Sequence, residues 1–112
     1  MGIQNWSDNI ILVNLTEEPQ MGEELQIATD MVAEKGNCDI VIDFAEVSII
    51  TSSSIAKLLK LRKAVQECGQ RLVFSSVRPQ TQKIFTITGL DGVFEFVDDQ
   101  FLALAGLQLV DS

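Results

Sequence analysis

The chain of 112 residues has no histidine, only two cysteines and no long apolar run. Without histidine, the Ser-His and Cys-His nucleophile arrangements are excluded, and so are the usual histidine metal ligands. Cys38 and Cys68 match neither a metal-site spacing nor a CxxC redox pair, so both are predicted to be reduced thiols. The apolar runs are far shorter than the roughly 20 residues that a helix needs to span a bilayer.

Basic residues are also scarce, with 8 Lys and Arg against 16 Asp and Glu, which gives a net charge of −8. The phosphate backbone of a nucleic acid would repel such a protein, so no nucleic-acid partner is predicted. An anionic membrane surface is disfavoured for the same reason, and no membrane insertion is expected. The first residues contain no basic region followed by an apolar one, so we expect no secretion signal and a cytoplasmic location.

The motifs of common catalytic and cofactor sites are missing as well. No GxGxxG or glycine-rich GK[ST] loop is present to hold nucleotide phosphates, and no GxSxG elbow surrounds a serine. Carboxylates are plentiful, but their spacing does not single out an acid–base pair. The sequence therefore predicts no cofactor, no metal and no enzymatic activity.

Apolar residues make up 46% of the chain, enough for one continuous core in a single domain over residues 1–112. Apolar periodicity predicts strands at residues 3–6, 10–15, 39–44, 71–77 and 93–97. It predicts helices at residues 23–35 and 53–68, a short helix opening at Arg78-Pro79, and a last helix at residues 100–109. Four residues are expected on the inner face of the last helix: Phe101, Leu102, Ala105 and Leu109.

This order, β-β-α-β-α-β-α-β-α, predicts an α/β fold with a mostly parallel central sheet, an N-terminal antiparallel strand and helices packed on the sheet. Loops that follow parallel strands share one end of such a sheet, where α/β folds tend to place their sites. These loops cover residues 16–22, 45–53 and 75–80. Asp43 ends the central strand, and we expect it either beside the middle loop's hydroxyls or capping that loop.

The middle loop ends in four consecutive hydroxyl side chains, Thr51, Ser52, Ser53 and Ser54, directly before a helical pattern. One interpretation is a helix cap, because Ser and Thr oxygens accept hydrogen bonds from the free N–H groups of the first turn. The other is a phosphoacceptor, since those N–H groups and the positive end of the helix dipole favour a phosphate. The pattern itself leaves both open.

The helix that follows carries four of the chain's eight basic residues: Lys57, Lys60, Arg62 and Lys63. They form either an ordinary solvated face or a local basic strip that helps to hold a phosphate or an acidic partner. We expect Ile55, Lys57 and Lys60 at a partner-facing rim beside the hydroxyls, although Ile55 equally fits the core side of the helix.

Several ordered motifs resemble the STAS domain and together cover residues 10–104. They are VIDF at 41–44, VSII at 47–50, SSSI at 52–55, KLL at 57–59, GQRLVF at 69–74, SVRP at 76–79, FTITGLD at 85–91 and VF at 93–94. The resemblance implies the STAS fold, also called SpoIIAA-like. Single-domain STAS proteins of bacteria are commonly anti-sigma-factor antagonists, so the resemblance also implies a protein-interaction module that acts in transcription regulation.

In that family, an anti-sigma serine kinase phosphorylates a serine at the start of the second helix, and a serine phosphatase reverses the reaction. The unphosphorylated antagonist binds the kinase and frees the sigma factor. By position, the resemblance implies Ser52 as the acceptor, with Ser53 and Thr51 as alternatives, and a partner-binding set of Thr51, Ser52, Ser53, Ser54, Ile55, Lys57 and Lys60. The sequence departs from the family pattern at Thr51, where an acid is usual, and at Ser54, where glycine is usual.

Other functions stay open beside this one. Some STAS domains with threonine in place of the acid are small subunits of lipid-transport ATPase complexes, so a constitutive docking subunit is the main alternative. A nucleotide-binding STAS module is a further class, although no phosphate loop supports it. An enzymatic function is a third class, and the serine hydroxyls, as possible nucleophiles, are almost the only feature of the sequence that supports it.

Overall fold

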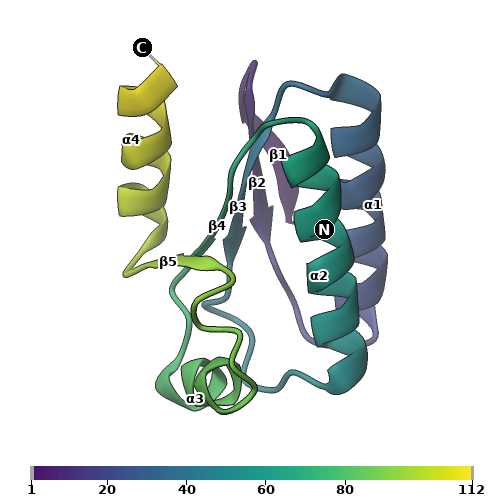
Figure 1. Cartoon of the computed structure of the whole chain (residues 1–112), viewed down its shortest axis with the longest axis vertical. Coiled ribbons are helices and arrows are strands. Elements are labelled where there is room, and N and C mark those ends of the chain that lie inside the picture. Colours follow the sequence, from purple (N-terminus) through teal and green to yellow (C-terminus); the bar gives the residue numbers. More distant parts are fainter. Residues whose placement is uncertain (1, 112) are drawn as a thin grey trace.

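The computed structural model describes residues 2–111, which form one five-stranded sheet with helices packed on it (Figure 1). The observed element order is the predicted one. Its elements are β1 (Ile3–Ser7), β2 (Ile10–Asn14), α1 (Gln20–Lys35), β3 (Asp39–Asp43), α2 (Ser52–Glu67), β4 (Leu72–Ser75), α3 (Pro79–Ile87), β5 (Glu95–Val97) and α4 (Gln100–Asp111).

The strands lie side by side in the order β1-β2-β3-β4-β5. Strand β1 pairs with β2 antiparallel, and all later pairs are parallel, as predicted. Every residue of β3 is buried, as expected for a central parallel strand covered on both faces. The edge strand β1 leaves its middle residues exposed.

Alternating side chains divide the core between the two faces of the sheet (Figure 1). Helices α1 and α2 lie side by side on one face, and α4 covers the other. The core on the α1 and α2 side includes Ile11, Val13, Ile40, Ile42, Phe74, Leu25 and Leu58. The core on the α4 side consists of Ile10, Leu12, Val41, Val73, Ala103, Leu104 and Leu107.

The predicted inner face of α4 is wrong at Phe101 and Leu102, while Ala105 is half-buried. Phe101 and Leu102 are 76% and 48% exposed, whereas Ala103, Leu104 and Leu107 are buried. Asp99 caps the helix by accepting a 2.8 Å hydrogen bond from the Leu102 N–H. The helix is apolar nearly all round, so its periodicity does not identify the face that packs on the sheet. The side chain of Leu109 lies outside the described residues.

Helix α1 begins three residues before the predicted start at residue 23, with Pro19 as its N-cap residue and Gly22 in its first turn. The first turn of a helix tolerates both residues, because its N–H groups have no carbonyl partners within the helix. The Gly22 N–H donates to the Glu18 carboxylate at 3.0 Å instead. Within residues 2–111, no helix has the length and apolar character that crossing a membrane requires.

Candidate functional site

The three loops that follow β2, β3 and β4 meet at one end of the molecule, the lower end of Figure 1, where α2 also begins. Direct hydrogen bonds join them. Glu17 of the first loop accepts from the Ser48 hydroxyl of the second at 2.6 Å, and Arg78 after β4 donates to the Ala45 carbonyl at 2.7 Å. The predicted convergence of these loops is therefore confirmed, and it places the hydroxyl stretch among them.

Thr51 and Ser54 form a capping box at the start of α2. The Thr51 Oγ1 accepts from the Ser54 N–H at 3.2 Å, and the Ser54 Oγ accepts from the Thr51 N–H at 3.1 Å. Ser54 is fully buried, and its hydroxyl also donates to Glu18 at 3.3 Å. Ser54, which stands where glycine is usual, is thus hydrogen-bonded to both Thr51 and Glu18. The helix-cap interpretation accounts for the hydroxyls of Thr51 and Ser54.

Ser52 and Ser53 are exposed, as is Thr51, but unlike Thr51 and Ser54 they take no part in the cap. Within residues 2–111, neither their hydroxyls nor their backbone N–H groups have a hydrogen-bond partner. They occupy the first two positions of α2, where the free N–H groups and the helix dipole attract negative charge. Of the four hydroxyls, these two are therefore both exposed and free of the cap, which leaves them open to a modifying enzyme.

Glu17 links the first loop to the segment before α2. Its carboxylate accepts from the Ser48 N–H at 3.0 Å, the Ser48 hydroxyl at 2.6 Å and the Ile49 N–H at 3.2 Å. The bond from the Ser48 hydroxyl contributes most to lowering the pKa of Glu17 below its ordinary value, followed by the Ile49 N–H. Desolvation acts in the opposite direction, and the Arg78 guanidinium lowers the pKa further.

Replacing Glu17 by glutamine is expected to lower the free energy of unfolding at pH 7 by about 1–2 kcal/mol, because hydrogen bonds to a charged group are lost. Since the folded pKa lies below the ordinary value of 4.5, this contribution is present above pH 4.5. It is lost as the pH falls below 4.5 and through the folded pKa. Urea denaturation of both proteins between pH 7 and 3 should show their difference shrinking, while the exposed Glu46→Gln control differs little at any pH.

Glu18 holds the start of α2 from the same loop. Besides the Ser54 hydroxyl, it faces the Lys57 Nζ at 3.9 Å, in a pair whose side chains are 31% and 43% exposed. Lys57 is therefore beside the cluster but already paired, whereas Lys60 is exposed one turn further along α2. Ile55 is half-buried and packs against the core on the α1 and α2 side.

Three residues of this end were not singled out from the sequence: Glu17, Glu18 and Ile49. The Ile49 side chain is 66% exposed beside Thr51, while its N–H is fixed by Glu17. The sequence did offer one indication for Glu17 and Glu18, because they are adjacent acids in a loop predicted to lie at the same end of the sheet as the hydroxyls. For Ile49, the sequence shows only one more apolar residue in an apolar run, which gives no sign of exposure.

Asp43 does not contact the hydroxyls at residues 51–54. One of its oxygens accepts from the Ala45 N–H at 3.0 Å, which is the loop-capping role. The other accepts from the Ser75 and Ser76 hydroxyls at 3.0 and 2.9 Å. This buried carboxylate therefore joins the ends of β3 and β4 beneath the site.

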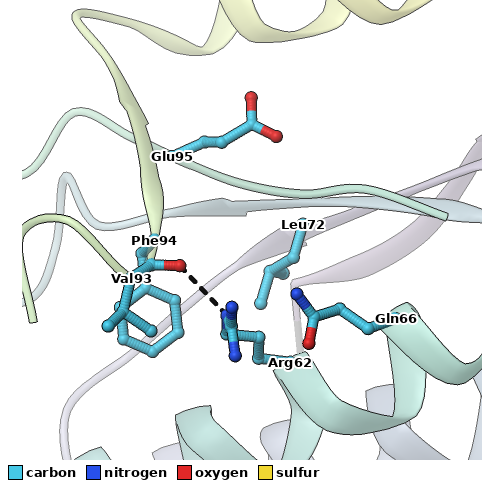
Figure 2. Close-up of a pocket in the computed structure, with 6 residues that line it drawn as sticks. All are labelled: Arg62, Gln66, Leu72, Val93, Phe94 and Glu95. Atoms are coloured by element: carbon cyan, nitrogen blue, oxygen red, sulfur yellow. Dashed lines mark hydrogen bonds between the residues drawn. The ribbon is translucent and has the colours of Figure 1, made fainter.

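A separate small pocket lies between the second half of α2 and the segment that enters β5 (Figure 2). Arg62 points into it and donates through Nε to the Val93 carbonyl at 3.0 Å. Arg62 is ten residues beyond Ser52, which corresponds to about 15 Å along a helix. One of the four basic residues of α2 thus fixes a loop far from the hydroxyl cluster, and Lys60 and Lys63 remain exposed.

The fold agrees with comparisons to known proteins. The family model of the STAS domain matches residues 8–103. The chain therefore belongs to the STAS domain family, as the sequence motifs predicted.

The chain is also similar to individual proteins. BtrV of Bordetella bronchiseptica, whose name assigns it to the anti-sigma factor antagonists, is 24% identical over 97 residues, covering 87% of this chain and 80% of that protein. A serine-to-glutamate variant of RsbS from Moorella thermoacetica superposes with a TM-score of 0.76 at 19% identity, covering 100% of both chains. Phosphorylated SpoIIAA of Bacillus gives a TM-score of 0.73 at 17% identity, covering 94% of this chain and 96% of that one.

Proposed function

We propose that this protein is an anti-sigma-factor antagonist, a non-enzymatic module that binds an anti-sigma serine kinase and is switched by phosphorylation at the start of α2. The observation that carries the proposal is the pair of exposed hydroxyls on Ser52 and Ser53, which make no hydrogen bond within residues 2–111, beside the cap formed by Thr51 and the buried Ser54. The similarity to BtrV and the phosphorylated state of the structural neighbour SpoIIAA support the same function.

Ser52 is the proposed acceptor, because it occupies the family position and is exposed. A phosphate there would add about −1.5 to −2 charges at pH 7. The first turn of α2 would tolerate this charge through its free N–H groups, whereas a kinase docked on the same surface would meet it directly. A serine phosphatase would reset the protein by removing the group.

The partner surface is proposed to surround the acceptor. Of the predicted set, Thr51, Ser52, Ser53 and Lys60 are exposed and Ile55 and Lys57 are half-buried, whereas Ser54 is fully buried and is left out of the proposed surface. Ile49 is added as an exposed apolar side chain. Exposed apolar side chains rimmed by polar ones are typical of protein interfaces. Glu17 fixes the backbone of Ile49, so this side chain would meet a partner with little loss of backbone freedom.

Incubation with ATP and an anti-sigma kinase, taken from the gene neighbourhood or from purification of bound partners, tests the proposal. Intact-mass measurement should show one added phosphate on the wild type and on Ser53→Ala, and none on Ser52→Ala. The phosphorylated protein should lose kinase binding at least about tenfold, because the phosphate places an additional negative charge within the contact surface. No phosphate on the wild type would refute the switch, and a phosphate surviving in Ser52→Ala would move the acceptor to Ser53 or Thr51.

The second candidate is a constitutive docking subunit of a transport ATPase complex or another unphosphorylated scaffold. It is favoured by the use of Thr51 and Ser54 as a structural cap, which needs no acid at residue 51 and no modification. Affinity purification from the native cell distinguishes the two, since a kinase partner supports the first function and a transport ATPase supports the second.

A further inference from the structure

Glu18 connects α1, α2 and the loop before α1 through one carboxylate. Its Oε1 accepts from the Gly22 N–H at 3.0 Å in the first turn of α1. Its Oε2 accepts from the Ser54 hydroxyl at 3.3 Å and lies 3.9 Å from the Lys57 Nζ in α2. A change in the contacts of this carboxylate would therefore affect the first turns of both α1 and α2.

Lys57 reaches Glu18 across the first turn of α1. The absence of a side chain at Gly22 makes room for it, because a Cβ there would lie 2.5 Å from the Lys57 Nζ. The ammonium is nevertheless not locked in place, since the side chain is 43% exposed and its partner 31% exposed. Exposed ion pairs of this kind are weak, and a stronger anion nearby can replace one partner.

Helix geometry gives Ser52 and Ser53 different access to Lys57. Residues four apart lie on the same face of a helix, so position 53 is adjacent to Lys57. The corresponding neighbours of position 52, three and four residues further on, are Ile55 and Ala56, which carry no charge. A negative charge at position 53 would thus compete with Glu18 for the only cation beside it in the described first two turns of α2.

We propose that Glu18 and Lys57 form an ion-pair relay that responds to charge at position 53 and not at position 52. A negative charge on residue 53 draws Lys57 away from Glu18, which weakens the hold of Glu18 on Gly22 and on the loop before α1. In the cell, this inference rests on the proposed function with its alternative acceptor, Ser53, as the source of the charge, and a phosphate on Ser52 alone would leave the pair intact: the γ-phosphoryl group of ATP is transferred to the Ser53 Oγ, ADP leaves, and the hydroxyl proton is released.

The relay is testable without a kinase by comparing Ser53→Glu with its matched control, Ser52→Glu. Both put a carboxylate in the first turn of α2 at an exposed site, so both gain the same favourable interaction with the helix dipole. Amide hydrogen exchange of Gly22, followed by NMR in the full chain, is the measurement. We expect exchange about twofold or more faster in Ser53→Glu and unchanged in Ser52→Glu.

The variant Lys57→Gln removes the ion pair between Lys57 and Glu18 and so shows how fast Gly22 exchanges without it. It should accelerate Gly22 exchange to a similar extent, and adding Ser53→Glu to it should cause no further change. Equal acceleration by the two glutamate variants, or an unchanged Gly22 exchange rate in Ser53→Glu or Lys57→Gln, would overturn the relay. These outcomes are independent of the kinase assay, so failure of the relay and failure of the proposed function are distinguishable.

Discussion

Replacing Asp43 by alanine is expected to lower the free energy of unfolding by about 3–4 kcal/mol, because several hydrogen bonds to one buried carboxylate are lost together. Asp43 is 5% exposed and accepts from the Ala45 N–H and from the Ser75 and Ser76 hydroxyls. Alanine would leave the fully buried Ser75 hydroxyl without its acceptor, and an unsatisfied buried donor costs about 1–3 kcal/mol. Urea denaturation at pH 7 measures the change.

Ser76 increases the expected loss. Its φ of 57° lies in the left-handed region, which costs a residue with a side chain about 1–3 kcal/mol when the surroundings enforce it. Its hydroxyl bond to Asp43 holds this turn between β4 and α3 in place. Removing the carboxylate should therefore loosen the loop from which Arg78 donates to the Ala45 carbonyl. The end of the sheet next to the site should become less stable as a result.

Asp43→Asn is the matched control, because it keeps the volume and one acceptor oxygen while removing the charge. We expect it to cost about half as much as alanine, since hydrogen bonds to a charged group are worth roughly twice those to a neutral one. A loss below about 1 kcal/mol in Asp43→Ala would contradict a central role for this network. Equal losses in both variants would show that the charge, rather than the number of acceptors, is what matters.

The order of elements could be predicted because apolar periodicity and helix signals agreed along most of the chain. The capping box could also be predicted in part, since Thr51 and Ser54 have the spacing that joins the first and fourth positions of a helix start. What the residue types could not decide was which hydroxyls the cap would use. The structure assigns Thr51 and Ser54 to the cap and leaves Ser52 and Ser53 exposed.

The contacts of the carboxylates around the hydroxyl cluster could not be predicted from neighbouring residues in the sequence. Glu17 and Glu18 reach Ser48 and Ser54 from 31 and 36 residues away, across a helix and a strand. Their side-chain directions depend on how the loop before α1 turns, and no periodic pattern specifies a loop. The same loop explains the early start of α1, because Glu18 satisfies the Gly22 N–H and lets the helix begin before the glycine.

Phe74→Ala is expected to destabilise the protein by about 3–5 kcal/mol, as large-to-small substitutions of buried aromatic residues do. Phe74 is fully buried in β4 at the centre of an aromatic cluster. Its ring lies 4.6 Å from that of Phe94, 4.9 Å from Phe44 and 5.9 Å from Phe85, between ring centroids. Since Phe85 belongs to α3 and Phe94 to the segment before β5, a cavity here would loosen both from the sheet.

The loss should be uneven across the molecule. Amide exchange should accelerate most in α3 and around β5, which depend on the cluster, and less in α1 and α2, which also pack on each other through their own buried faces. Phe74→Leu keeps much of the volume and should cost clearly less than alanine. If Phe74→Ala unfolded every element to the same extent, or cost no more than Phe74→Leu, the aromatic cluster would not be what holds α3 against the sheet.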